Sequence, residues 1–148
     1  VMAQKITQFE DEHQADAVFI DAGFGTGIVS AGQGLGRDWT LVWFAAASGD
    51  IGCLNKRAEM WKGARDWLKA GGALPPDPTL RDELQSPEIV PRMDGKLQIE
   101  SKKDMKSRGV PSPNRADALV LSFAYPVVKK SPIDAYRRSA SLDYDPYA

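Results

Sequence analysis

The first stretch of the sequence that could carry chemistry ends in a carboxylate. Asp21 follows the apolar run at residues 17–20 and precedes three glycines, Gly23, Gly25 and Gly27. A continuous apolar run predicts a strand buried on both faces of a parallel sheet, and ligands bind just beyond the carboxyl ends of such strands. Because a buried charge is costly unless it is paired, Asp21 is a candidate ligand of a divalent cation. Alternatively, Asp21 only caps the helix that follows.

The three glycines predict a tight turn, because residues without a Cβ allow another group to approach closely. Their spacing is not G-x-G-x-x-G, and the sequence contains no G-x-x-x-x-G-K-[ST] motif. A dinucleotide site or a phosphate-binding loop of the P-loop type is therefore disfavoured. We instead expect Gly23, Gly25 and Gly27 to form a loop near the site at Asp21.

A second candidate carboxylate, Asp117, lies on a helix that Ser112 and Pro113 are expected to begin, as N-cap and first helical residue. Its neighbours Ala116 and Ala118 are small, so this part of the helix could approach another backbone closely. The alternative is a solvent-exposed carboxylate that interacts only with the helix dipole.

The densest group of basic residues in the chain lies just before that helix. Ser101 and Asp104 predict the start of a short helix, which Gly109 ends. Basic clusters of this kind bind the phosphate backbone of nucleic acids, although most are simply solvated. The candidate DNA-binding residues are Lys102, Lys103, Lys106 and Arg108.

The elements that must position these residues alternate between helix and strand. Helices are expected over residues 1–12, over residues 28–35, and from near Asn55 to the glycines at 71–72. Strands are expected at residues 17–21 and 39–44, parallel to each other across the intervening helix. A β-hairpin is expected at residues 89–100, where an Asp-Gly pair separates two alternating runs. The pattern predicts an α/β fold.

The composition is that of an ordinary domain with balanced charge. The 148 residues include 20 acidic and 19 basic ones, for a formal net charge of -1, so binding to nucleic acid would depend on a local basic cluster. The single cysteine, Cys53, excludes a disulfide within the chain and favours a reducing compartment. No apolar run is long enough to span a bilayer and no signal-peptide pattern is present, so we expect an intracellular protein without a membrane partner.

Three segments together resemble the C-terminal nuclease domain of the large subunit of tailed-bacteriophage terminases. They are residues 15–21 (ADAVFID) with the glycines that follow, residues 55–61 (NKRAEMW), and residues 101–109 (SKKDMKSRG) leading to residues 112–119 (SPNRADAL). The order and spacing of the blocks make the resemblance specific, and it extends to about Ala124.

This resemblance implies an RNase H-like (resolvase-like) fold with a central, largely parallel sheet. It implies that Asp21 and Asp117 are catalytic acids that bind Mg²⁺ or Mn²⁺, two ions in the family, and that the domain cleaves concatemeric double-stranded viral DNA during packaging. Such chemistry suits carboxylates, because these ions take hard oxygen ligands and an ion pair stabilises the attacking and leaving oxygens. The family also implies the portal protein and the small terminase subunit as partners, in the host cytoplasm.

The sequence departs from the family at its start. The family's first metal-binding acid lies on an N-terminal strand that has no counterpart in this sequence, and the Walker motif of the family's ATPase domain is absent as well. We interpret the chain as a C-terminal piece of a terminase large subunit, with a nuclease-type domain at residues 1–126 and a flexible tail at residues 127–148. The alternative is a catalytically incomplete fragment that acts as a DNA- or portal-binding module.

Overall fold

The structure is a computed structural model that describes residues 1–133, so most of the predicted tail lies outside the described residues. It divides into two compact units. The first comprises residues 1–42 and the described residues from Pro126 onward, and the second comprises Trp43–Tyr125. No helix within residues 1–133 is long and apolar enough to cross a membrane.

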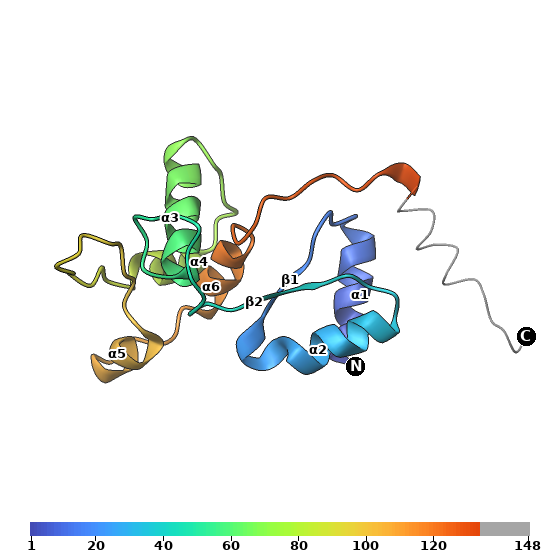
Figure 1. The fold of residues 1–148 in the computed structure, drawn as a ribbon, viewed down its shortest axis with the longest axis horizontal. Coiled ribbons are helices and arrows are strands. Elements are labelled where there is room, and N and C mark those ends of the chain that lie inside the picture. Colours follow the sequence, from blue (N-terminus) through green and yellow to red (C-terminus); the bar gives the residue numbers. More distant parts are fainter. Residues whose placement is uncertain (134–148) are drawn as a thin grey trace, which may run out of the picture. The chain divides into compact units, whose positions relative to one another are not determined.

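In its described part, the first unit contains two helices and two parallel strands (Figure 1). Helix α1 (Met2–Glu12) is followed by β1 (Phe19–Asp21), α2 (Ala22–Gly34) and β2 (Thr40–Val42). The predicted parallel pairing is confirmed, with Ile20 opposite Leu41. The prediction that β1 is buried on both faces is wrong, because all three of its residues are only half-buried. Among the described residues β2 is its sole partner strand.

The core of the first unit forms where α1 and α2 meet the loop before β2. Ala3, Val29 and Trp39 are buried together there. Gly32 of α2 lies directly against the Trp39 ring, since a Cβ at this position would come within 2.4 Å of it. Helix α2 can therefore pack this closely only because residue 32 has no side chain.

The acidic end of α1 is partly buried. Glu10 is only 5% exposed and accepts a hydrogen bond from Trp39 Nε1 at 2.7 Å. Its carboxylate also accepts one from Lys130 Nζ at 2.8 Å and lies 3.5 Å from Arg37 Nη1. Arg37 in turn binds both carboxylate oxygens of Asp11, at 2.6 and 2.8 Å. Buried charges of this kind are retained because each has a partner.

The second unit contains four helices among the described residues (Figure 1). They are α3 (Lys56–Lys69), α4 (Pro78–Gln85), α5 (Lys102–Ser107) and α6 (Asn114–Leu121), and α6 packs against both α3 and α4. Side chains cap the first three of these helices: those of Asn55, Asp77 and Ser101 accept hydrogen bonds from backbone N–H groups.

The predicted hairpin is reduced to a single antiparallel bridge between Ile89 and Ile99. The turn is present, with Gly95 at a φ of +71°, but no extended strands flank it. Two local causes are visible: Pro91 has no N–H to continue the ladder, and Leu97 forms a parallel bridge with Cys53 instead. Cys53 itself is 2% exposed, as expected for a small apolar core residue.

Candidate active site

Asp21 ends β1 and caps α2. Its Oδ1 accepts a hydrogen bond from the backbone N–H of Gly23 at 2.9 Å, so the capping alternative describes a contact that is present. Its other oxygen, Oδ2, accepts no hydrogen bond within residues 1–133. Capping therefore uses one of the two oxygens, and the role of Asp21 as a metal ligand stays a prediction.

The expected glycine loop after Asp21 is absent, because α2 begins directly at Ala22 and takes in Gly23, Gly25 and Gly27. At position 25 of this helix a glycine is needed for packing. A Cβ there would lie 2.2 Å from Ile20 Cγ2, so α2 approaches β1 too closely for any side chain at that position. A Cβ at Gly27, in contrast, would meet nothing within 4 Å. The close approach predicted from the glycines is that of the helix to its own strand.

Asp117 lies in the first turn of α6 and is only 5% exposed. The alternative of a solvent-exposed carboxylate is therefore wrong. Trp61 Nε1 donates a hydrogen bond to Oδ1 at 3.4 Å, and Arg57 Nη2 lies 3.7 Å from the same oxygen. Lys102 Nζ lies 2.9 Å from Oδ2 without hydrogen-bond geometry, which leaves that buried oxygen without a hydrogen bond. Residues from α3 and α5 thus surround the carboxylate with positive charge.

Helix α6 is held in place by a residue of α4. The predicted N-cap at Ser112 is wrong, since Pro113 occupies the cap position and has no side chain to accept a hydrogen bond. The carboxylate of Glu83 takes over this role, because its Oε2 accepts from the backbone N–H groups of Arg115 at 2.6 Å and Ala116 at 3.0 Å. The position of Asp117 therefore depends on α4 as well as on its own helix.

Arg57 is a site residue that the sequence patterns did not reveal. Although Lys56 and Arg57 are basic residues at the start of α3, they are only 6% and 8% exposed. Burial lowers the pKa of the Arg57 guanidinium, and the charge of Asp117 opposes that shift. The one sequence signal for a role of Arg57 was its position in residues 55–61, one of the segments that carry the terminase resemblance, one helical turn before Trp61.

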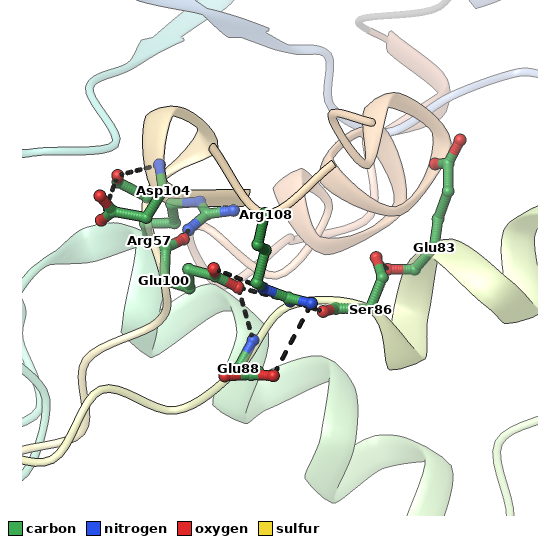
Figure 2. A network of polar contacts seen from close by, with 8 residues as sticks. Arg57, Glu83, Ser86, Glu88, Glu100, Asp104 and Arg108 are labelled. Carbon is green, nitrogen blue, oxygen red and sulfur yellow. Dashed lines mark hydrogen bonds and ion pairs between the residues drawn. The ribbon is translucent and has the colours of Figure 1, made fainter. Parts of the chain in front are cut away.

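The predicted DNA-binding residues divide into two kinds. Arg108 is engaged inside the unit, where Nε and Nη2 bind the Glu100 carboxylate at 2.8 Å each and Nη2 also donates to Ser86 O at 2.6 Å (Figure 2). Lys102 faces Asp117. Lys103 and Lys106 are exposed and form no ion pair within the described part of the chain.

The fit of this arrangement to a divalent cation is partial. Carboxylate oxygens are the ligand type that Mg²⁺ and Mn²⁺ prefer, and Asp117 Oδ2 is a buried oxygen without a hydrogen bond. However, residues 1–133 contain no group of three or more histidine, cysteine, aspartate or glutamate residues that could hold a metal ion. Asp21 lies in the first unit and Asp117 in the second, so their convergence stays a prediction.

A cavity of about 600 Å³ is lined by residues of α3 and α4, Trp61 among them. Its wall is apolar, with leucines at positions 68, 74, 80 and 84 and a run of prolines at 75, 76 and 78. The only carboxylate that lines it, Asp77, is already used to cap α4 and to bind Arg115 at 2.7 Å. Asp117 is not among the residues that line this cavity.

No protein-family model matches the chain, and no curated protein matches it either. Solved structures do. The nuclease domain of the large terminase subunit gp2 of bacterial virus Sf6 aligns with a TM-score of 0.69 at 24% sequence identity, covering 84% of this chain and 72% of that chain. The fold is that of a terminase nuclease domain.

Two structures of one lysine-to-alanine variant of the Sf6 subunit align in the same way. The one with calcium gives a TM-score of 0.69 at 23% identity over 84% of this chain and 71% of that chain. The one with manganese gives a TM-score of 0.66 at 23% identity, and the match covers 84% of this chain and 72% of that chain. The predicted α/β class and the resemblance drawn from the three sequence segments are thereby confirmed at the level of the terminase nuclease fold.

Proposed function

We propose that the chain is the metal-dependent endonuclease domain of a phage terminase large subunit, which cleaves concatemeric double-stranded viral DNA during packaging. One observation carries this proposal: the Asp117 carboxylate is buried among Arg57, Trp61 and Lys102 in a chain with the terminase nuclease fold. A buried carboxylate that is matched by specific positive partners is typical of functional sites.

Asp21 and Asp117 are the proposed catalytic, metal-binding residues, and Mg²⁺ or Mn²⁺ is the proposed ion. The calcium and manganese in the Sf6 structures support this choice. A pair of such ions, when bound, stabilises the attacking and leaving oxygens of an in-line displacement at phosphorus. The chain's own part is to present carboxylate oxygens in fixed positions, one at the end of β1 and one on the first turn of α6.

DNA is the proposed substrate, and the basic residues around α5 are its proposed contacts. Lys103 and Lys106 have free ammonium groups for phosphate oxygens, whereas Lys102 and Arg108 are already paired within the unit. The portal protein and the small terminase subunit are the further partners that we propose, with the host cytoplasm as the place of action.

A second candidate function is a DNA- or portal-binding module that does not cleave. The observation in its favour is that the residues described here include no group of three acidic or metal-binding side chains, while α5 presents exposed lysines. Such a module would bind DNA in a salt-dependent way without any need for metal, because phosphate contacts release counterions.

Cleavage of supercoiled plasmid distinguishes the two functions. The chain is incubated with plasmid in Mn²⁺, Mg²⁺ or EDTA, beside Asp21→Asn and Asp117→Asn variants that keep the side-chain shape and remove the charge. An Asp82→Asn variant is the matched control, because Asp82 is 72% exposed in its side chain. We expect nicking that requires metal, that both site variants lose, and that the control keeps.

Nicking that survives both site substitutions would contradict the endonuclease proposal for these residues. If the chain binds DNA but does not nick it in any metal, the binding module is the better description.

A further inference from the structure

The Arg57 side chain is buried, but its hydrogen bonds do not satisfy all of its guanidinium N–H groups. It is 8% exposed, yet among residues 1–133 Nε and Nη2 have no hydrogen-bond partner and only Nη1 donates, to the backbone carbonyl of Glu100. Leaving guanidinium donors unused in a buried place is costly, so a residue of this kind is retained for something other than packing.

The base from which this side chain projects is fixed. The backbone N–H of Arg57 donates to Phe44 O at 2.9 Å, and that of Lys56 donates to Ala46 O at 2.8 Å. Asn55 caps the same turn by accepting from Ala58 N at 3.0 Å. The first turn of α3 is thus tied to the preceding segment, which fixes the backbone from which the guanidinium extends.

From this base Arg57 reaches two other elements. The carbonyl that it contacts belongs to Glu100 (Figure 2). Glu100 directly precedes Ser101, the N-cap of α5, and Lys102 is the first residue of that helix. Its other terminal nitrogen, Nη2, lies 3.7 Å from Asp117 on α6. One turn further along α3, the Trp61 ring lies 5.8 Å from the guanidinium carbon and donates its N–H to the same Asp117 oxygen.

We infer that Arg57 is a positioning residue of the proposed site, which holds the Asp117 carboxylate in the orientation needed to bind a divalent cation. This inference rests on the proposed function. Arg57 acts through Asp117 and does not itself touch substrate. Its two terminal nitrogens serve two partners at once, a geometry that the single nitrogen of lysine cannot reproduce.

The test compares the Mn²⁺ affinity of the chain with that of Arg57→Lys and Arg57→Gln variants, measured by calorimetric titration. Circular dichroism and thermal unfolding first establish that each variant is folded. Arg65→Lys is the matched control, on the same helix with a side chain that is 49% exposed. Because loss of a residue that orients a metal ligand typically weakens binding 10–100-fold, we expect about that loss for both Arg57 variants and none for the control.

A double-mutant cycle shows whether Arg57 acts through Asp117. In an Asp117→Asn background we expect Arg57→Lys to cause no further loss of Mn²⁺ affinity. Losses that add up in the double variant would overturn the inference, and so would wild-type affinity in either folded Arg57 variant.

A readout without metal keeps the inference independent of metal binding. Hydrogen exchange of the Trp61 indole N–H, followed by NMR, reports whether Asp117 stays in place to accept it. We expect faster exchange in Arg57→Lys, of the same size as in Asp117→Ala, which removes the acceptor altogether, and unchanged exchange in Arg65→Lys. If Asp117→Asn binds Mn²⁺ as well as the wild type does, the proposed function fails and the indole exchange alone decides the role of Arg57. Unchanged exchange would then overturn it.

Discussion

Arg108 and Glu100 form a forked ion pair in which two guanidinium nitrogens, Nε and Nη2, each lie 2.8 Å from a carboxylate oxygen. The same carboxylate accepts from the backbone N–H of Glu88 at 3.1 Å, and Arg57 binds the Glu100 carbonyl (Figure 2). Glu100 is therefore held through its side chain and its backbone at once. It connects the segment after α4 to the start of α5.

Removal of the fork should loosen this connection. We expect Arg108→Ala to lower the melting temperature of the chain, because the Glu100 carboxylate, whose side chain is 8% exposed, loses its charged partner. Thermal unfolding followed by circular dichroism measures the change. Arg81→Ala removes an arginine whose side chain is 72% exposed and should leave the melting temperature unchanged. An equal effect of the two substitutions would contradict this account of Glu100.

The same pair should make the stability of the chain depend on pH. The Arg108 guanidinium holds the pKa of the Glu100 carboxyl below its ordinary value of 4.5. Because the folded pKa is the lower one, this stabilisation is complete above the unfolded pKa and is lost as the pH falls through the folded pKa. Urea unfolding at a series of pH values below 5 should show a shallower loss of stability in Glu100→Gln than in the wild type. If the free energy of unfolding falls equally with pH in both proteins, the Arg108–Glu100 pair does not link stability to pH.

Two glycines of α2 should respond in opposite ways to the same substitution. Gly25→Ala forces a methyl group into Ile20, so we expect it to destabilise the fold by about 1–3 kcal/mol. Gly27→Ala adds a methyl group in open space within the helix and should stabilise the fold by about 0.5–1 kcal/mol. Chemical denaturation of both variants gives the two free energies. Destabilisation by Gly27→Ala would mean that this part of α2 is not helical.

The cap that α4 provides for α6 should be measurable by itself. Glu83→Ala leaves two backbone N–H groups at the start of α6 without an acceptor, and we expect a loss of about 0.5–2 kcal/mol in stability. The neighbouring Asp82→Ala variant, which removes only an exposed surface carboxylate, serves as the comparison. If both variants unfold at the same denaturant concentration, Glu83 does not cap α6.

The exposed lysines of α5 should determine how salt affects DNA binding. In Lys103→Gln/Lys106→Gln we expect the slope of log affinity against log salt to fall by roughly 2, because each phosphate contact contributes about 0.9. Fluorescence anisotropy with a labelled duplex at several salt concentrations measures this slope. Lys69→Gln removes an exposed lysine of α3 and should keep the wild-type slope. An unchanged slope in the double variant would exclude these lysines as phosphate contacts.

The elements whose ends depend on local chemistry could be predicted from the sequence. Helix α3 begins next to Asn55 and Ser101 caps α5, both as expected, because a cap involves residues only two or three positions apart. The parallel pairing of β1 with β2 was also predictable, since a strand–helix–strand unit of this length allows few alternatives.

The charged contacts that sequence patterns missed depend on residues far apart in the chain. Glu10 is buried because Trp39 and Lys130 reach it, at separations of 29 and 120 residues. Arg57 looks like part of a basic helix face until Asp117, on another helix, is placed beside it. Periodicity reports which face of a helix is apolar and says nothing of which charged residue will find a partner.

The contacts of Lys130 have a consequence for the order in which the chain can fold. Its backbone N–H and its ammonium group bind Asp16, Ala15 and Glu10, so the first unit is completed by a residue that follows the entire second unit. On the ribosome, α1 would emerge long before its last partner, with the Glu10 charge not yet fully matched. The second unit is continuous in sequence and could close while the first one waits.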